Sequence, residues 1–178
     1  ICLLLKMNFN VGAQLMIGLP GQNIESSLND LDKLAKVSGG EKITLRIYPC
    51  LVLKGTQLER MMSQGTYRPL SVQQAAEWSG IIMRKAEEIG FPVQRVGLQE
   101  TESLSKSIVA GPHHPALGEL ARSEALVLDL LELGVSGPWK VPSQKISLLF
   151  GHNRYGLKRL SESTGLCQND LEKDIHFV

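Results

Sequence analysis

Cysteines are few in this sequence, and none of them stand close together. The three are Cys2, Cys50 and Cys167, with no C-x-x-C pair among them. This spacing excludes a zinc ribbon, a thioredoxin-type redox motif and a local set of iron–sulfur ligands. Widely separated cysteines are typical of proteins in a reducing compartment, so we expect a cytoplasmic protein with no metal site of its own.

Long apolar runs and an excess of one charge are also absent. No stretch approaches the roughly 20 apolar residues of a membrane span, and no signal or transit peptide is visible. The 19 Lys and Arg residues nearly balance the 18 Asp and Glu residues, so net charge alone favours neither nucleic acid nor membrane as a partner. The chain opens on Ile1 in the apolar run ICLLLK, and we expect it to be a fragment of a longer protein.

Over residues 1–100, strand-length segments alternate with segments of helical periodicity. Residues 11–19 are mostly apolar, which predicts a strand covered on both faces. This alternation predicts an α/β fold with a parallel sheet. The other expected elements are a helix capped by Asn23 and ended by Gly39 and Gly40, a strand over 42–48, a helix over 56–64, a helix from Ser71 to 88, and a strand over 93–98.

After residue 100 the pattern changes, and we expect a second, smaller α/β unit over residues 101–178. A connection over 100–114 leads into a helix that starts near Pro115 and runs to 133. Beyond a linker at 134–138, the expected elements are a strand over 144–150, a helix over 153–163 and a last strand over 171–178.

Polar residues and glycines mark the ends of the first two strands. The G-L-P-G-Q run from Gly18 to Gln22 suits close approach of a ligand to the backbone, although a tight turn explains it equally well. Its spacing matches neither a dinucleotide-binding motif nor a P-loop. The side-chain amide of Gln14 is either buried with its hydrogen bonds made inside the protein or in contact with a ligand. Arg46 needs a carboxylate or a ligand unless its strand lies at an edge.

Two segments are locally basic. Residues 42–70 hold five basic residues against Glu59, and residues 140–160 hold five with no acid, among them Arg154 and Lys158. Such patches either contact RNA phosphates or are solvated faces. The adjacent His113 and His114 either shape a turn or act as an acid or base; they do not predict a metal site without further ligands.

Three segments carry more specific motifs. They are QLMIGLPGQ at 14–22, LRIYPCLVLKGTQLERMMSQGTYRPLS at 45–71 and IVAGPHHPALGELA at 108–121. Together they resemble the radical S-adenosylmethionine superfamily, above all the catalytic subunit of Elongator and its bacterial relatives. The R-I-Y-P-x-L-V-x-[KR]-G-T stretch followed by Y-x-P-L is the most specific part, and the resemblance covers roughly residues 1–125.

The resemblance implies a (β/α)6 partial barrel in which a C-x3-C-x2-C loop holds a [4Fe–4S] cluster. That cluster reduces S-adenosylmethionine to a 5′-deoxyadenosyl radical. Residues 11–19 and 42–48 would be the fifth and sixth strands, so residues 1–100 would be the C-terminal part of the barrel and residues 101–178 an α/β extension.

The resemblance also implies functional residues. The cofactor-binding candidates are Gln14, Gly18, Pro20, Arg46, Tyr48 and Pro49. For substrate or RNA the candidates are Lys54, Thr56 and His114, to which the charge pattern adds Arg154 and Lys158.

One departure limits the implied activity. The chain has no C-x3-C-x2-C, and Cys50 stands where the motif usually has Thr. We therefore expect no catalysis and no bound cofactor for this chain alone, whether it is a fragment or a degenerate copy. Its intact parent would use S-adenosylmethionine and the cluster, with tRNA as a partner and tRNA modification as its role.

Two alternatives remain open: an enzyme like oxygen-independent coproporphyrinogen oxidase, which shares G-L-P-G-Q, and a non-catalytic RNA-binding module.

The expected partners are the missing N-terminal half of the barrel, possible tRNA, and a second copy paired through an exposed strand edge at 11–19.

Overall fold

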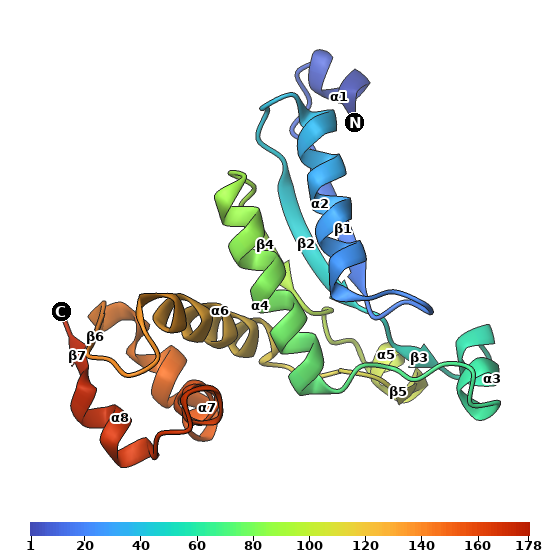
Figure 1. Cartoon of the computed structure of the whole chain (residues 1–178). Helices are drawn as coiled ribbons and strands as arrows, with labels where there is room; N and C mark the ends of the chain where they lie inside the picture. The colour runs from blue at the N-terminus through green and yellow to red at the C-terminus, as the bar shows by residue number, and fades with distance from the viewer.

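A computed structural model describes all residues 1–178 and shows a mixed α/β chain with parallel sheets and no closed barrel (Figure 1). The elements of the first part are α1 (Cys2–Lys6), β1 (Gly12–Ile17), α2 (Ile24–Ser38), β2 (Thr44–Pro49), β3 (Val52–Leu53), α3 (Gln57–Ser63), α4 (Val72–Glu88) and β4 (Val93–Val96). Those that follow are α5 (Glu102–Ser107), β5 (Ile108–Ala110), α6 (Leu117–Leu133), β6 (Trp139–Val141), the short helix η1 (Ser143–Lys145), α7 (Ile146–Thr164), α8 (Gln168–Asp174) and β7 (Ile175–Phe177).

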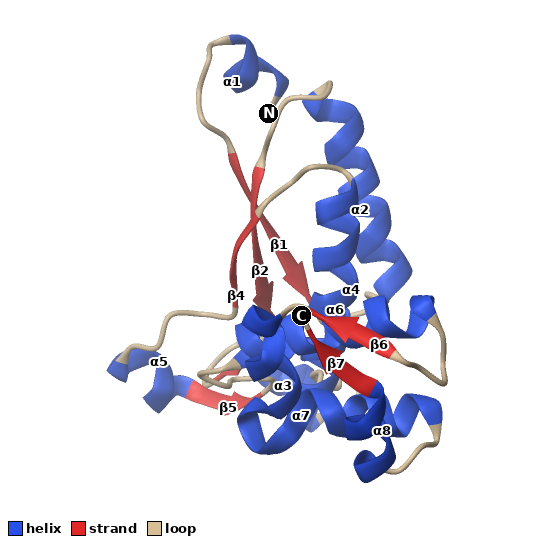
Figure 2. Cartoon of the chain, turned by 90° about the vertical axis from the view of Figure 1, so that its left-hand side faces the viewer, coloured by secondary structure: helices blue, strands red, loops and turns tan.

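The main sheet has three parallel strands in the order β1-β2-β4. Helices α2 and α4 lie on one side of it, and no helix lies on the other (Figure 2). Side chains on the covered face, such as Ile17, Leu45 and Ile47, are fully buried against the helices. The sheet therefore has one packed face and one open face.

The helix boundaries follow the capping residues in the sequence. Asn23 and Ser71 each accept a hydrogen bond from the backbone N–H three residues on, completing capping boxes at the starts of α2 and α4. Gly39 ends α2 in the left-handed conformation, with φ of 62°. The predictions of these helices and of the strands at 11–19, 42–48 and 93–98 are confirmed.

Strand β1 differs from its prediction. We expected it to be covered on both faces, but it lies at the edge of the sheet, and Gly12, Gln14 and Met16 on its outer face are exposed. Its apolar residues on the other face, with Ile17 fully buried, pack against the helices. The strand is thus half-buried.

A second core lies in the C-terminal part of the chain. It combines residues of α6, β6, α7, α8 and β7, and its largest side chain is Trp139. The Trp139 indole N–H donates to the carbonyls of Leu130 and Gly134, both at 2.9 Å, and so closes the end of α6. Strands β6 and β7 form a two-stranded parallel sheet, and β3 pairs with β5 in antiparallel fashion.

Three predictions in this part are wrong or incomplete. Residues 144–150 are helical rather than a strand: η1 covers 143–145, and the first turn of α7 buries Leu149 in the second core before the backbone leaves the helical conformation at residues 151–154. Of the strand predicted at 171–178, only 175–177 is extended; 168–174 is helix α8. The connection at 100–114 contains α5 and β5. None of the helices has the length and apolar character that a bilayer-spanning segment needs.

Candidate functional site

The open face of the main sheet carries a row of polar side chains. Gln14 of β1 is the register partner of Arg46 of β2, and Arg46 is the partner of Arg95 of β4. All three are exposed. Parallel pairing places partners on the same side of a sheet, so an amide and two guanidinium groups lie side by side on the uncovered surface.

Arg46 has no carboxylate partner, although β2 is the central strand of the sheet. Its guanidinium lies over the neighbouring strand: a Cβ added at Gly12 would be 3.9 Å from Arg46 Nη1. Because Arg46 is on the open face, its N–H donors are accessible to solvent and to an anionic ligand. Gln14 is likewise exposed, so it is not a satisfied core amide.

Met16 and Tyr48 form the next row, toward the carboxyl ends of β1 and β2. Met16 is 39% exposed and Tyr48 is half-buried. Pro49, the last residue of β2, is buried and pairs with Ile17. Tyr48 is therefore accessible from the open face, whereas Pro49 contributes to packing at the end of the strand.

The G-L-P-G-Q loop is held by its own side chains and by a distant tyrosine. Gln22 accepts from the N–H of Leu19 and donates to the carbonyl of Met16, both at 3.0 Å. The Tyr67 hydroxyl donates to the carbonyl of Gly18 at 2.7 Å. Gly18 has φ of 81°, and a Cβ there would lie 2.9 Å from Leu70 Cγ. The loop is a tight turn stabilised by these three hydrogen bonds, and it leaves Pro20 exposed.

Tyr67 is a site residue that sequence reasoning did not single out. It lies in the Y-x-P-L motif, which is the one signal in the sequence that could have pointed to it. Burial raises the pKa of the Tyr67 phenol, and a hydrogen bond with the buried Cys50 adds to the rise. The phenol therefore stays protonated and keeps donating to the loop.

The K-G-T segment leads from β3 into α3. Lys54 is exposed, and its backbone N–H donates to the carbonyl of Ser107 at 2.8 Å. The Thr56 hydroxyl donates to the carbonyl of Leu53 at 2.7 Å and accepts from the N–H of Glu59 at 3.4 Å, so Thr56 caps α3. Lys54 is free to contact a ligand, and Thr56 has a capping role that accounts for its hydroxyl.

His114 shapes the turn before α6. Its Nδ1 accepts from the backbone N–H of Ala116 at 3.1 Å. The ring lies 6.5 Å, centroid to centroid, from that of His152, which contacts the carboxylate of Glu119. No three His, Cys, Asp or Glu residues come close enough to hold a metal ion.

The basic segment at 140–160 is partly neutralised by residues outside it. Arg154 pairs with Glu172 of α8 and lies over the ring of Phe150, 5.6 Å from its centroid. Arg159 pairs with the buried Glu124 at 2.6 Å. The basic residues here that form no ion pair are Lys140, Lys145 and Lys158, all exposed.

The structure brings some of the predicted site residues together and separates others. Gln14, Arg46 and Tyr48 share the open face, with Gly18, Pro20 and Pro49 at its carboxyl edge. Helix α7, with Arg154 and Lys158, lies with the C-terminal elements, away from β1 (Figure 1). The candidate site is therefore the open sheet face and its edge.

Comparisons with known proteins identify relatives for much of the chain. The family described as Radical_SAM C-terminal domain matches residues 44–126. The tRNA uridine(34) acetyltransferase of Methanocaldococcus jannaschii is 30% identical over 118 residues, which is 66% of this chain and 21% of the relative. The protein of the same name from Methanocaldococcus infernus is 29% identical over the same coverage. The chain spans about a fifth of the length of these relatives.

Proposed function

Because residues 44–126 belong to the Radical_SAM C-terminal domain family and the chain is distantly homologous to tRNA uridine(34) acetyltransferases, we propose that it forms the C-terminal part of a radical S-adenosylmethionine enzyme that modifies tRNA. Residues 1–100 would end a (β/α)6 partial barrel, and residues 101–178 would form its extension. The chain would not be catalytic by itself.

The observation that carries this proposal is the open face of the β1-β2-β4 sheet. Gln14 and Arg46 are register partners there, exposed and without an ion pair. A parallel sheet is ordinarily covered on both faces, so an uncovered face with polar residues in its centre fits one wall of a ligand chamber. The rest of the barrel would enclose that chamber.

The free edge of β1 fits the same interpretation. Only β2 pairs with β1, so its other side presents unpaired backbone groups. Met16 within the strand and Leu19 just after it are each 39% exposed. A preceding barrel strand would satisfy these groups, and a second copy of the chain could pair there in its absence.

The residues present fit one of the two cofactors that the family implies. Gln14, Arg46 and Tyr48 would hold S-adenosylmethionine, because its ribose and amino-acid groups need polar partners of this kind. When bound, that cofactor supplies the precursor of a carbon radical. The [4Fe–4S] cluster does not fit: Cys2 and Cys167 are exposed, Cys50 is buried, and no cluster of ligands exists. Its cysteines would come from the remainder of the barrel.

The exposed cations near the open face support tRNA as the substrate. Arg95 on the sheet and Lys54 beside α3 form no ion pair, so each is available to a phosphate. The relatives named above are tRNA enzymes, and no observation favours a porphyrinogen substrate. A separate RNA-binding module at 140–160 has less support, because Arg154 and Arg159 are engaged in ion pairs.

Photocrosslinking tests the proposal. An anticodon stem–loop carrying 4-thiouridine at the wobble position is irradiated with the chain, and the crosslinked peptides are mapped by mass spectrometry. We expect crosslinks within 12–17 or 44–49, strongly reduced in Arg95→Ala and unchanged in Lys36→Ala, an exposed lysine on α2. Crosslinks confined to 140–160 would instead support the RNA-binding module, and an absence of crosslinks would refute a tRNA substrate.

A further inference from the structure

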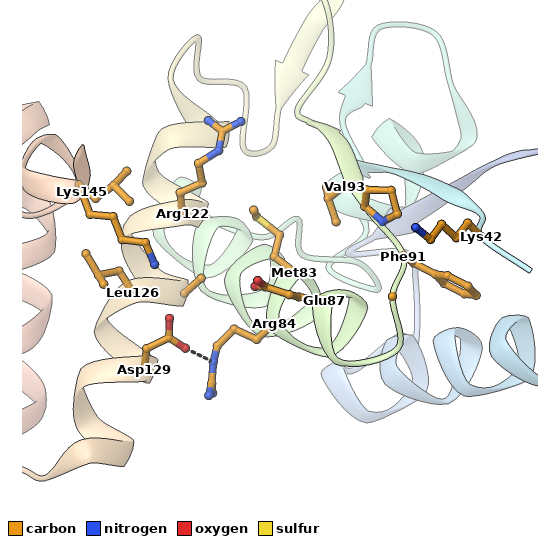
Figure 3. A pocket seen from close by; sticks show the side chains of 14 residues that line it. Lys42, Met83, Arg84, Glu87, Phe91, Val93, Arg122, Leu126, Asp129 and Lys145 are labelled. Atoms are coloured by element: carbon orange, nitrogen blue, oxygen red, sulfur yellow. Dashed lines mark hydrogen bonds and ion pairs between the residues drawn. The ribbon is translucent and has the colours of Figure 1, made fainter. Parts of the chain in front are cut away.

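A cavity lies at the opposite end of the sheet from the G-L-P-G-Q loop. Its volume is about 580 Å³, and it lies beside the amino ends of β2 and β4, where Lys42 and the segment Phe91–Val93 precede or begin the strands. Residues of α4, α6 and the start of α7 complete it (Figure 3). The cavity is thus separate from the open sheet face.

The floor of this cavity is apolar. Met83 of α4 and Val93 of β4 face it from one side, and Leu126 of α6 and Leu148 of α7 from the other. Phe91 and Leu126 are buried, and the others are half-buried. A surface of this kind accepts a flat or aliphatic body of drug-like size, since such sites typically measure about 300–1,000 Å³.

The rim carries charged side chains of both signs that form no ion pair with one another. Lys42 and Lys145 enter from opposite sides, with Glu87 between them, and Arg122 lies at the Lys145 side (Figure 3). None of these four forms an ion pair, and all are exposed. A fifth charged residue, Arg84, is already bound to Asp129 at 2.8 Å and to Glu132 at 2.5 Å.

We infer that this cavity binds a nucleoside phosphate whose base carries an amino group. The base would lie on the apolar floor, its amino group would donate to Glu87, and the phosphates would contact Lys145 and Arg122, which lie on the same side of the cavity. The apolar floor, Glu87 and the two cations of that side then each have a partner. A fatty acid would leave Glu87 beside an apolar chain, and inorganic phosphate would leave the floor empty.

Calorimetric titration of the full chain with ADP tests this. We expect saturable binding with a dissociation constant of about 10–100 μM. IDP, which has a carbonyl in place of the amino group, should bind about 10-fold more weakly, because Glu87 would then face an acceptor. Adenosine and pyrophosphate, each offering half of the contacts, should both bind more weakly than ADP.

Exposed residues provide matched variants. Lys145→Glu should weaken ADP binding by about 10-fold or more, whereas Lys36→Glu, the same change at an exposed site on α2, should leave it unchanged. Glu87→Gln should reduce the preference for ADP over IDP. Circular dichroism of each variant verifies that the fold is retained.

The remaining results show whether the bound nucleotide is free or is the end of an RNA, and which findings would overturn the inference. If a short RNA with a 5′-phosphorylated adenosine end displaces ADP at similar concentration, the nucleotide belongs to an RNA end; if it does not, the ligand is a free nucleotide. The inference is overturned if ADP does not bind, if Lys145→Glu binds it unchanged, or if pyrophosphate or decanoate binds as tightly. None of these results depends on whether the wobble uridine crosslinks to the open face.

Discussion

Arg46 of β2 and Arg95 of β4 are register partners on the open face of the sheet, with no carboxylate between them. Like charges directly opposite each other on neighbouring strands destabilise a sheet. Arg95 has one side-chain hydrogen bond, to Gln99 at 3.4 Å. An arrangement that lowers stability and leaves both guanidinium groups without an anionic partner is typical of a ligand-binding surface.

We therefore predict that Arg95→Gln stabilises the chain and weakens RNA binding. Removing the repulsion should raise the free energy of unfolding by about 0.5 kcal/mol. Binding of the anticodon stem–loop, followed by fluorescence anisotropy, should weaken several-fold and depend less steeply on salt. Arg95→Lys serves as the control, because it keeps the charge. A destabilised Arg95→Gln chain with unchanged RNA affinity would contradict the prediction.

The raised pKa of Tyr67 predicts a loss of stability at high pH. Burial holds the folded phenol protonated, whereas the unfolded phenol ionises near pH 10. The contribution to stability is therefore complete below about pH 10 and is lost as the pH rises toward the folded pKa. Tyr67→Phe should lower the free energy of unfolding by about 1 kcal/mol at pH 7, because the hydrogen bond to Gly18 is lost.

Urea unfolding between pH 7 and pH 11.5 measures this effect. Above about pH 10 the stability of Tyr67→Phe should decline less steeply than that of the unaltered chain, by up to roughly 1.4 kcal/mol per pH unit. The remaining decline includes Tyr155, whose pKa is also raised by burial and by its hydrogen bond with Glu124. Parallel curves for the two chains would show that Tyr67 does not ionise on unfolding.

The sequence predicted those parts of the fold that depend on local signals. Asn23 and Ser71 begin helices because each cap acts on the turn that follows it. Gln14 and Arg46 were predicted as a polar interruption of apolar strands, and the structure places them side by side. A period-two pattern shows that a residue alternates with the core, but it does not show which strand lies at the edge.

Contacts between residues far apart in the chain could not be predicted from the sequence. Tyr67 reaches Gly18 across 49 positions, and Arg159 reaches Glu124 across 35. For the same reason a charge count over 140–160 overestimated the basic surface, since the acids that neutralise it lie on α6 and α8. The short apolar run at 144–150 fits either a strand or a helix, and the second core selects the helix.

Close packing of α4 on α6 predicts that Gly80→Ala is destabilising. A Cβ at Gly80 would lie 2.7 Å from Glu124 Cβ and 2.9 Å from the carbonyl oxygen of Ala121, so the backbone of α6 must move. We expect a loss of about 2 kcal/mol in the free energy of unfolding, although alanine favours a helix by about 1 kcal/mol over glycine. Gly118→Ala is the control.

At Gly118 the added Cβ would meet nothing closer than 3.4 Å, the carbonyl oxygen of Val96. This variant should be unchanged or slightly more stable, because only the helix propensity changes. Both variants are compared by urea denaturation. Equal stabilities would mean that α4 and α6 are not packed as closely as described.

The ion pair between Arg159 of α7 and Glu124 of α6 joins the two helices where water is largely excluded. Glu124 is 3% exposed, and its Oε1 accepts from Arg159 Nε at 2.6 Å and from the Tyr155 hydroxyl at 2.5 Å. Arg159→Met would leave the carboxylate buried without its cation, and we expect a loss of about 3 kcal/mol in the free energy of unfolding.

The neighbouring substitution Lys158→Met, at an exposed position, should change stability by less than about 0.5 kcal/mol. The double variant Glu124→Leu/Arg159→Met removes both charges, and it should recover much of the loss, because the penalty comes from the unpaired carboxylate rather than from a missing attraction. Urea denaturation of the unaltered chain, Arg159→Met, Glu124→Leu and the double variant completes the cycle. Additive losses in the double variant would show that the two residues act independently, and that α6 and α7 are held together by the apolar residues of the second core instead.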